Sequence, residues 1–268
     1  LRPGQPDAYP LARAVALLPS DMRGLNEPVA QISVRHTHFE NLAVIAELRE
    51  DDSGLHIYRV GRLSALIAAE LGHGDLFCAA LERAARLHDI GKLAIRDQVI
   101  TKPGKLNSAE FEHVARHTIY GHRLLSLLTD DGEMSREVAL CHHEYWGGGG
   151  YPRKLVGIAI PESARIVAVA DCFESLCHVR PYRKEWTVEE SLAEIRSLSG
   201  AAFEPRIVRS LEAVVTKLRT ETNASTPLDQ LLVPDIPSSM LRARGEVLAL
   251  IDTLPLPWQN NEQSPMFI

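Results

Sequence analysis

The sequence predicts an all-α fold, and three observations support this prediction. Between about residues 38 and 220, apolar side chains recur every three or four positions, which is the spacing of one helix face. No segment in this range shows the alternating pattern of a half-buried strand. Short polar breaks separate the periodic segments, as is typical of helices joined by short loops. We therefore expect a compact multi-helix bundle without internal repeats.

Each helix is placed by its periodic apolar residues, in chain order. The first carries Phe39, Leu42 and Ile45 on one face, and the second carries Val60 and Leu63. The expected helices cover about residues 38–50, 54–71, 75–90, 108–128, 134–141, a segment that begins at 161, 187–199, 205–220 and 238–254.

Local signals indicate where several helices begin. Ser53 and Ser108 are expected N-caps, because a hydroxyl oxygen accepts hydrogen bonds from the free amides of a first turn. Pro161 is expected at a helix start, where its missing N–H costs little. Residues 93–107 are expected to form an irregular connection with a turn at Lys102–Gly104.

Three regions differ in composition. Residues 1–37 are rich in proline and glycine and are expected to be an N-terminal extension or linker. Residues 38–220 hold the predicted helical domain, and residues 221–268 a Pro-rich linker with one amphipathic helix. The chain starts at Leu1 rather than methionine, so we expect an upstream domain in a longer protein.

The bulk composition excludes some functions. The chain has 268 residues, 45% of them hydrophobic, and a formal charge of -6, which does not suit binding to a nucleic-acid polymer. No apolar run approaches the roughly 18 residues of a membrane span. No CxxC pair occurs, so we expect free thiols and a cytoplasmic location; the four cysteines are Cys78, Cys141, Cys172 and Cys177.

Seven potential metal ligands lie on the inward faces of five different predicted helices. Taken singly, each histidine is as well explained as a core residue bonded to a backbone carbonyl. Taken together, the seven indicate two divalent ions that share a carboxylate, with Asp89 as the natural bridge and a bridging hydroxide as the nucleophile. Imidazole and carboxylate suit iron, manganese, nickel or zinc. The residues are His56, His88, Asp89, His117, His142, His143 and Asp171.

Positive and aromatic residues near these motifs suit an anionic nucleotide. Lys92 follows Asp89 by one turn and could bind a phosphate oxygen or protonate a leaving group; the alternative is a surface lysine. Arg180 and Arg183 could hold phosphates, or form a solvated basic turn.

The glycine run Gly147–Gly150 is expected to form a mobile or substrate-contacting loop, with a plain connector as the alternative. Beside it, Trp146 and Tyr151 offer flat faces for a purine base, or simply pack. The loop is therefore a second candidate part of the site.

Several separated motifs resemble one family. Over about residues 38–215 the chain resembles the HD-GYP domain, a bacterial subgroup of the HD phosphohydrolase superfamily. The motifs are His88–Lys92, His142–Trp146, Gly150–Pro152, Val169–Phe173 and Arg180–Lys184, and they occur in the family's order.

The resemblance implies a helical HD-type phosphohydrolase with a core metal centre that hydrolyses cyclic di-GMP to pGpG and, in some members, GMP. It implies two or three ions, often iron or manganese. One ion would be held by His56, His88, Asp89 and Asp171. The second would be held by Asp89, His117, His142 and His143. Lys92 would meet the scissile phosphate, and Tyr151, Arg180 and Arg183 the nucleotide.

The resemblance also implies bacterial signalling of the two-component type. Such domains usually follow a receiver or other sensory domain, and they bind diguanylate cyclase (GGDEF) domains through the glycine-rich loop. Asp52 stands where many relatives have glutamate; it is a candidate ligand of a third metal ion, or a residue that hydrogen-bonds to a metal ligand without contacting the ion. His178 and Val179 stand where small or acidic residues are usual. Two alternatives stay open: a hydrolase of another cyclic dinucleotide, and a catalytically silent module that binds cyclic di-GMP or a cyclase.

Overall fold

The computed structural model of the chain describes residues 29–49, 54–127, 132–178, 186–221 and 232. The chain divides into two compact units, residues 1–234 and 235–268, and the second lies outside the described residues. Within the described ranges the regular elements are helices, apart from one isolated bridge between Ser199 and Phe203. The predicted all-α fold is confirmed. The predictions for Ser53 and for a helix over 238–254 fall outside these ranges.

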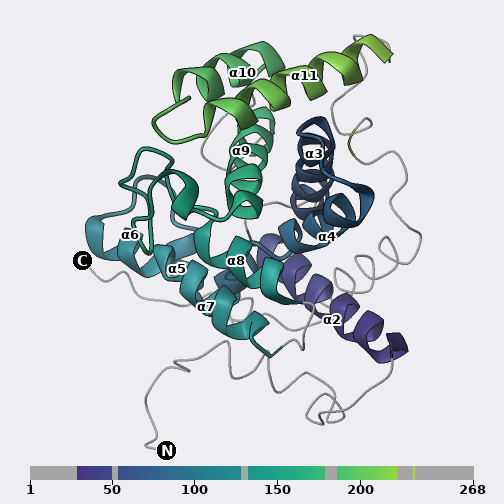
Figure 1. Cartoon of the computed structure of the whole chain (residues 1–268). Coiled ribbons are helices and arrows are strands. Elements are labelled where there is room, and N and C mark those ends of the chain that lie inside the picture. The colour runs from purple at the N-terminus through teal and green to yellow at the C-terminus, as the bar shows by residue number, and fades with distance from the viewer. Residues whose placement is uncertain (1–28, 50–53, 128–131, 179–185, 222–231, 233–268) are drawn as a thin grey trace, which may run out of the picture. The chain divides into compact units, whose positions relative to one another are not determined.

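The described elements are nine α-helices longer than one turn, joined by short connections and three short helical segments (Figure 1). In chain order they are α2 (Val29–Glu47), α3 (His56–Glu70), α4 (Asp75–Ala85), η2 (Ile90–Ala94), α5 (Asp97–Ile100), α6 (Ser108–Ala115), α7 (His117–Leu125), α8 (Glu133–Cys141), η4 (Gly157–Ala159), α9 (Glu162–Cys177), α10 (Val188–Ser197) and α11 (Pro205–Glu221).

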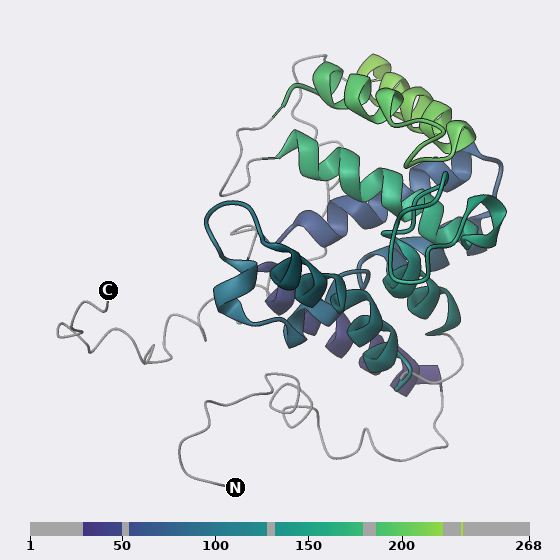
Figure 2. The ribbon, with the colours of Figure 1, turned by 90° about the vertical axis from the view of Figure 1, so that its left-hand side faces the viewer.

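The packing of these helices brings distant parts of the sequence together. Helix α3 packs against α4 and α9, and α7 packs against α8 and η2. Helix α2 covers η2 from another side. Figures 1 and 2 show α10 and α11 lying over α9 and α3, and both helices contact α9. Helices α3, α7, α8 and α9 and segment η2 therefore surround one region of the interior.

A single large apolar cluster joins α3, α4, α9, α10 and α11. Its members are removed from water, so their burial stabilises the mutual position of these helices. Because α3 and α9 share this core, the first residue of α3 is held against the middle of α9. Fully buried members include Leu63, Ile67, Leu81, Phe173, Ile195, Ile207 and Leu211.

Some predicted boundaries were wrong. Helix α2 begins at Val29 rather than near His38, and α4 ends at Ala85 rather than at residue 90. The expected irregular connection over 93–107 contains α5 and the end of η2. These segments are too short to show a helical period, so the sequence pattern does not reveal them.

The predicted long helix over 108–128 is two helices, and its predicted cap was wrong. Asn107, not Ser108, is the N-cap: its side chain accepts from the Glu110 amide, and the Glu110 carboxylate accepts from the Asn107 amide. Helix α6 stops at Ala115 and α7 starts at His117. The break places His117 at the start of a helix that faces η2.

Candidate metal centre

All seven predicted ligands lie in the described part of the chain, and they form two adjoining groups. In each group, one nitrogen or oxygen atom per residue lies within 4.8 Å of the corresponding atoms of the others. The first group is His56, His88 and Asp171, from α3, the turn that follows α4, and α9. The second group is Asp89, His117, His142 and His143.

Asp89 lies between the groups, because its two carboxylate oxygens face different ways. Oδ1 lies 3.1 Å from Nε2 of His117 and 3.5 Å from Nε2 of His142. Oδ2 lies 3.2 Å from Nε2 of His88. One carboxylate thus contacts a histidine of the first group and two of the second, which is the arrangement that a bridging ligand needs.

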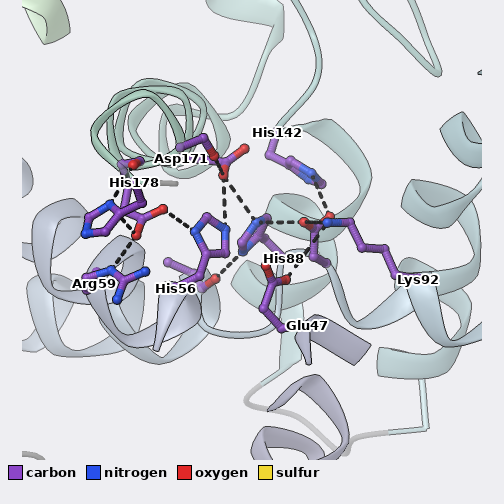
Figure 3. A network of polar contacts seen from close by, with 12 residues as sticks. Glu47, His56, Arg59, His88, Lys92, His142, Asp171 and His178 are labelled. Carbon is purple, nitrogen blue, oxygen red and sulfur yellow. Dashed lines mark hydrogen bonds and ion pairs between the residues drawn. The ribbon is translucent and has the colours of Figure 1, made fainter. Parts of the chain in front are cut away.

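Asp171 occupies the corresponding place in the first group. Its Oδ1 lies 3.2 Å from Nε2 of His56 and 3.7 Å from Nε2 of His88. Figure 3 shows the side chains of these three residues pointing toward one another, from α3, α9 and the turn between α4 and η2. The carboxylate faces imidazole nitrogens that are almost fully buried.

Three of the histidines are oriented by a hydrogen bond from Nδ1, the ring nitrogen that faces away from the centre. A carbonyl oxygen can only accept, so Nδ1 must carry the proton and Nε2 is left to face the centre. This orientation is common among metal-binding histidines. The bonds run from His88 to Ala85 at 2.8 Å, from His117 to Val114 at 2.7 Å and from His142 to Val138 at 3.0 Å.

The donor set fits divalent metal ions. Nε2 of His88 and Oδ1 of Asp89 are buried and make no hydrogen bond within the described residues. A buried polar atom without a partner costs about 1–3 kcal/mol. Coordination would satisfy both atoms, and the mixture of imidazole and carboxylate suits first-row divalent metals.

Glu47 was missed from the sequence and lies at the same centre. Its side chain on α2 is fully buried, and neither carboxylate oxygen makes a hydrogen bond within the described residues. With His56 and Asp89 it forms a third metal-type group, again within 4.8 Å. A signal was available, because Glu47 lies on the helix face of Phe39 and Ala43.

The pKa shifts of these buried histidines also differ between the two metal-type groups. Burial favours neutral His56, but the carboxylates of Glu174 and Glu47 outweigh it and raise its pKa well above the usual range. Burial is likewise outweighed at His88, whose pKa is raised by Asp89. At His143 burial dominates, with help from neighbouring imidazoles, and the pKa falls well below its usual range.

Lys92 is buried rather than on the surface, so the alternative of a surface lysine was wrong. Its Nζ lies 2.8 Å from Oδ2 of Asp89 and 3.9 Å from Oε2 of Glu47 (Figure 3). The close approach of η2 to α7 requires glycine at position 91, since a Cβ there would lie 1.9 Å from the His117 carbonyl oxygen. Gly91 thus allows Lys92 to enter the centre.

The glycine-rich loop is held by hydrogen bonds. The buried Glu144 carboxylate accepts from the amides of Arg153 and Leu155, at 2.6 and 3.0 Å. Gly148 and Gly149 have φ of 92° and 89°, the left-handed region that favours glycine. The run therefore has a structural reason beyond flexibility.

This anchored loop brings Tyr151 against the centre. The Tyr151 amide donates to the His143 carbonyl at 3.1 Å, and its ring stacks on the His143 ring at a centroid distance of 4.8 Å. Trp146 differs, because the Arg165 guanidinium lies over its ring at 5.5 Å. Tyr151 is thus the loop aromatic that adjoins the metal-type groups.

Three predicted site residues cannot be placed. Asp52, Arg180 and Arg183 lie outside the described residues, so their proposed roles rest on the sequence alone. Among the helices that the structure describes, none combines the length and apolar composition needed to cross a membrane.

An all-helical fold with an adjacent His–Asp pair between two metal-type groups defines the class of HD phosphohydrolases. Comparison with known families agrees: residues 33–207 match the family described as HD domain, and the chain belongs to that family. One solved structure, an HDG"Y"P protein from Bdellovibrio bacteriovorus, shares the fold with a TM-score of 0.51 at 15% identity. The matched region covers 76% of this chain and 68% of the chain of the Bdellovibrio protein.

Curated relatives match the same region. A cyclic di-GMP phosphodiesterase of Thermotoga maritima is 42% identical over 192 residues, covering 70% of this chain and 52% of the relative. The response regulator RpfG of Xanthomonas campestris, a cyclic di-GMP phosphodiesterase, is 42% identical over 176 residues, covering 63% and 45%. A 3'3'-cGAMP-specific phosphodiesterase of Vibrio cholerae is 36% identical over 184 residues, covering 67% and 35%.

The chain spans about half or less of the length of these relatives. The resemblance to the HD-GYP group that the sequence motifs indicated is confirmed. The domain boundaries at 37 and 220 stay predictions.

Proposed function

We propose that the chain is a metal-dependent phosphodiesterase that hydrolyses cyclic di-GMP to pGpG; further cleavage to GMP is the alternative end product, as in some members of the family. The observation that carries the proposal is the pair of metal-type groups joined at Asp89, with buried Lys92 on the same carboxylate. The names of the two relatives at 42% identity support the substrate.

We assign the ligands as the geometry groups them. His56, His88 and Asp171 would hold one ion, His117, His142 and His143 the other, and Asp89 would contact both. When bound, divalent ions would stabilise negative charge on the phosphate oxygens and lower the pKa of a coordinated water molecule. Iron or manganese suits this donor set, with nickel or zinc as alternatives.

The chain's own residues bind and orient the substrate. Lys92 is proposed to contact a phosphate oxygen or the leaving oxygen, since its charge lies within 2.8 Å of the bridging carboxylate. Tyr151 is proposed to contact the nucleotide base, because its ring borders His143. Arg180 and Arg183 are proposed to hold the nucleotide phosphates.

A second candidate substrate is 3'3'-cGAMP. Three relatives from Vibrio cholerae, 34–36% identical, are named as specific for that dinucleotide. The two candidates share the phosphodiester and differ in one base, so the metal-type groups do not discriminate between them. Residues that contact the base, such as Tyr151, would do so.

The signalling context is also proposed. We expect cytoplasmic action downstream of a receiver or other sensory domain in bacterial two-component signalling. The anchored loop around Gly147–Gly150 is the proposed contact for diguanylate cyclase domains.

A substrate panel tests the proposal. The chain, purified without oxygen and analysed for metals, is incubated with cyclic di-GMP, 3'3'-cGAMP and pGpG. We expect two ions per chain and cleavage of cyclic di-GMP. His88→Ala and Asp89→Ala should lose turnover together with most of the bound metal. Two bound ions without cleavage of any dinucleotide would instead support a silent binding module.

A further inference from the structure

Glu174, on α9, has no assigned role, yet its carboxylate is buried beside the metal centre. Its side chain is 1% exposed. Oε2 is hydrogen-bonded to Nδ1 of His56, and Oε1 accepts from Nε of Arg59. Nδ1 of His178 lies 3.0 Å from Oε1. A buried carboxylate is costly to desolvate, and these partners offset that cost.

His56 differs from three other histidines of the centre in the hydrogen-bond partner of its Nδ1 atom. His88, His117 and His142 each donate Nδ1 to a carbonyl three or four residues earlier in the chain. His56 is the first residue of α3, and its Nδ1 faces a side chain instead of a backbone carbonyl. The carboxylate of Glu174, 118 residues away, takes the place of that carbonyl.

The contacts of His56 point in two directions. Nδ1 faces Glu174, while Nε2 lies 3.2 Å from Oδ1 of Asp171 (Figure 3 shows His56 reaching Asp171). An ionised carboxylate can only accept, so the proton lies on Nδ1. Nε2 is thereby directed to the first metal-type group.

We propose that Glu174 is a positioning residue for His56 as a metal ligand. Its carboxylate fixes the imidazole tautomer and ring orientation, and its negative charge makes Nε2 a stronger metal ligand. Arg59 in turn holds Oε1 and balances the buried charge. This inference rests on the proposed metal centre, and it concerns the ion held by His56, His88 and Asp171 alone.

Glu174→Gln tests this role with minimal change in volume. The amide presents one acceptor instead of two, so it cannot serve both His56 and Arg59 as the carboxylate does. If its NH₂ group faces His56, the proton moves to Nε2 and blocks coordination. Glu174→Asp keeps the charge with a shorter reach and should show a smaller effect.

Glu204→Gln is the matched control. Glu204 is also a buried carboxylate paired with arginines, Arg165 and Arg206, but it contacts none of the seven predicted ligands. A general loss of buried ion pairing would affect Glu204→Gln and Glu174→Gln alike.

The readout is Mn²⁺ affinity of the metal-stripped full chain, from the free Mn²⁺ signal in electron paramagnetic resonance. We expect wild type to bind two ions, and Glu174→Gln to bind one of them about 10- to 100-fold more weakly. Glu174→Asp should fall between, and Glu204→Gln should match wild type. Thermal unfolding of the metal-free variants reports separately on folding.

The outcomes separate the two proposals. Wild-type affinity for both ions in Glu174→Gln and Glu174→Asp, with lowered thermal stability, would mean a purely structural ion pair and overturn the inference. Two bound ions in wild type without cleavage of cyclic di-GMP would overturn the proposed function, while the variant affinities still decide the role of Glu174. Absence of Mn²⁺ binding by wild type would overturn both.

Discussion

Gly91 is the residue whose size matters most to the centre. A Cβ at this position would lie 1.9 Å from the His117 carbonyl oxygen and 2.4 Å from the Gly121 amide nitrogen, both of them backbone atoms. Backbone cannot yield as a flexible side chain can, so η2 would have to separate from α7.

Gly91→Ala is therefore expected to lower the free energy of unfolding by about 3 kcal/mol, the upper end of the usual cost of overpacking. Urea unfolding of the metal-free chain measures this. Gly74→Ala is the control, since nothing lies within 4 Å of a Cβ there and its φ is -74°. Equal stability of Gly91→Ala and wild type would contradict the proposed close packing.

Replacement of Lys92 separates the effect of its positive charge on turnover from the binding of the metal ions. Lys92→Met keeps most of the apolar stem and removes the ammonium that faces Asp89. We expect turnover of cyclic di-GMP to fall by about 100-fold or more, as for other removed groups that stabilise developing charge. Metal content should stay at two ions. Unchanged turnover would exclude a role of Lys92 in the chemistry.

The sequence identified the metal ligands by their residue type and their position on an apolar helix face. It missed residues that act by holding another side chain in place. His56, His88, His117 and Asp171 carry their own signal, because metal-type side chains on apolar faces are unusual. Glu174 carries the same type of signal, since it follows Ala170 by four positions and Asp171 by three on α9, but its partner His56 lies 118 residues away. Only the packing of α3 on α9 makes them neighbours. Glu47 could have been found, as a carboxylate on an apolar helix face.

At the scale of elements, Glu144 determines the course of the loop between α8 and α9. Its carboxylate accepts two loop amides, and both would be left without this acceptor in Glu144→Ala. We expect kcat/KM for cyclic di-GMP to fall by about 10- to 100-fold, because the Tyr151 ring loses its fixed position. Mn²⁺ affinity should be unchanged, since Glu144 belongs to none of the metal-type groups.

Tyr145→Ala is a suitable control for this loop. Tyr145 is 45% exposed and takes no part in the two hydrogen bonds by which Glu144 holds the loop amides. If Glu144→Ala and Tyr145→Ala had equal kcat/KM, the anchoring role of the carboxylate would be wrong.

Element boundaries show why periodicity alone is insufficient. The apolar pattern runs through residues 108–128, but the chain breaks into α6 and α7. No glycine or proline stands at Arg116, and the break coincides with bonds from His117 and Thr118 side chains to carbonyls of the preceding turn. Both bonds span only three residues, and the apolar period continues through the break, so the sequence indicates the helical state and not the break.

For the whole molecule, bound metal is expected to add stability. Its ligands come from five elements that the fold must hold together, and an ion that binds only the folded chain stabilises it by about 2.7 kcal/mol at 100 times its Kd. The melting temperature should rise by about 5–10 °C on adding Mn²⁺ to metal-free protein. Addition of a chelator should reverse the shift, and a rise in Asp89→Ala as large as in wild type would argue against this centre.

The pH dependence should differ between the two ions. In the metal-free chain the pKa of His56 is raised, since the carboxylates of Glu174 and Glu47 outweigh burial, so a metal must displace its proton near neutrality. Burial lowers the pKa of His142 and His143, which are already neutral there.

We therefore expect affinity at the His56 group to fall by up to about tenfold for each unit of decreasing pH between 8 and 6, one displaced proton being lost. The group with His142 and His143 should change less. Mn²⁺ titrations at three pH values measure both. A steeper dependence at the His142 group would contradict the assignment.

The distribution of the ligands along the chain bears on when the centre can form during synthesis. A nascent chain that ends before α9 contains His56, His88 and His142 but neither Asp171 nor Glu174. Its first group would lack the Asp171 carboxylate, and His56 would lack the partner that orients it. Full-strength metal binding therefore requires that α9 has been translated and has packed against α3, so metal loading follows this packing step and does not trigger it.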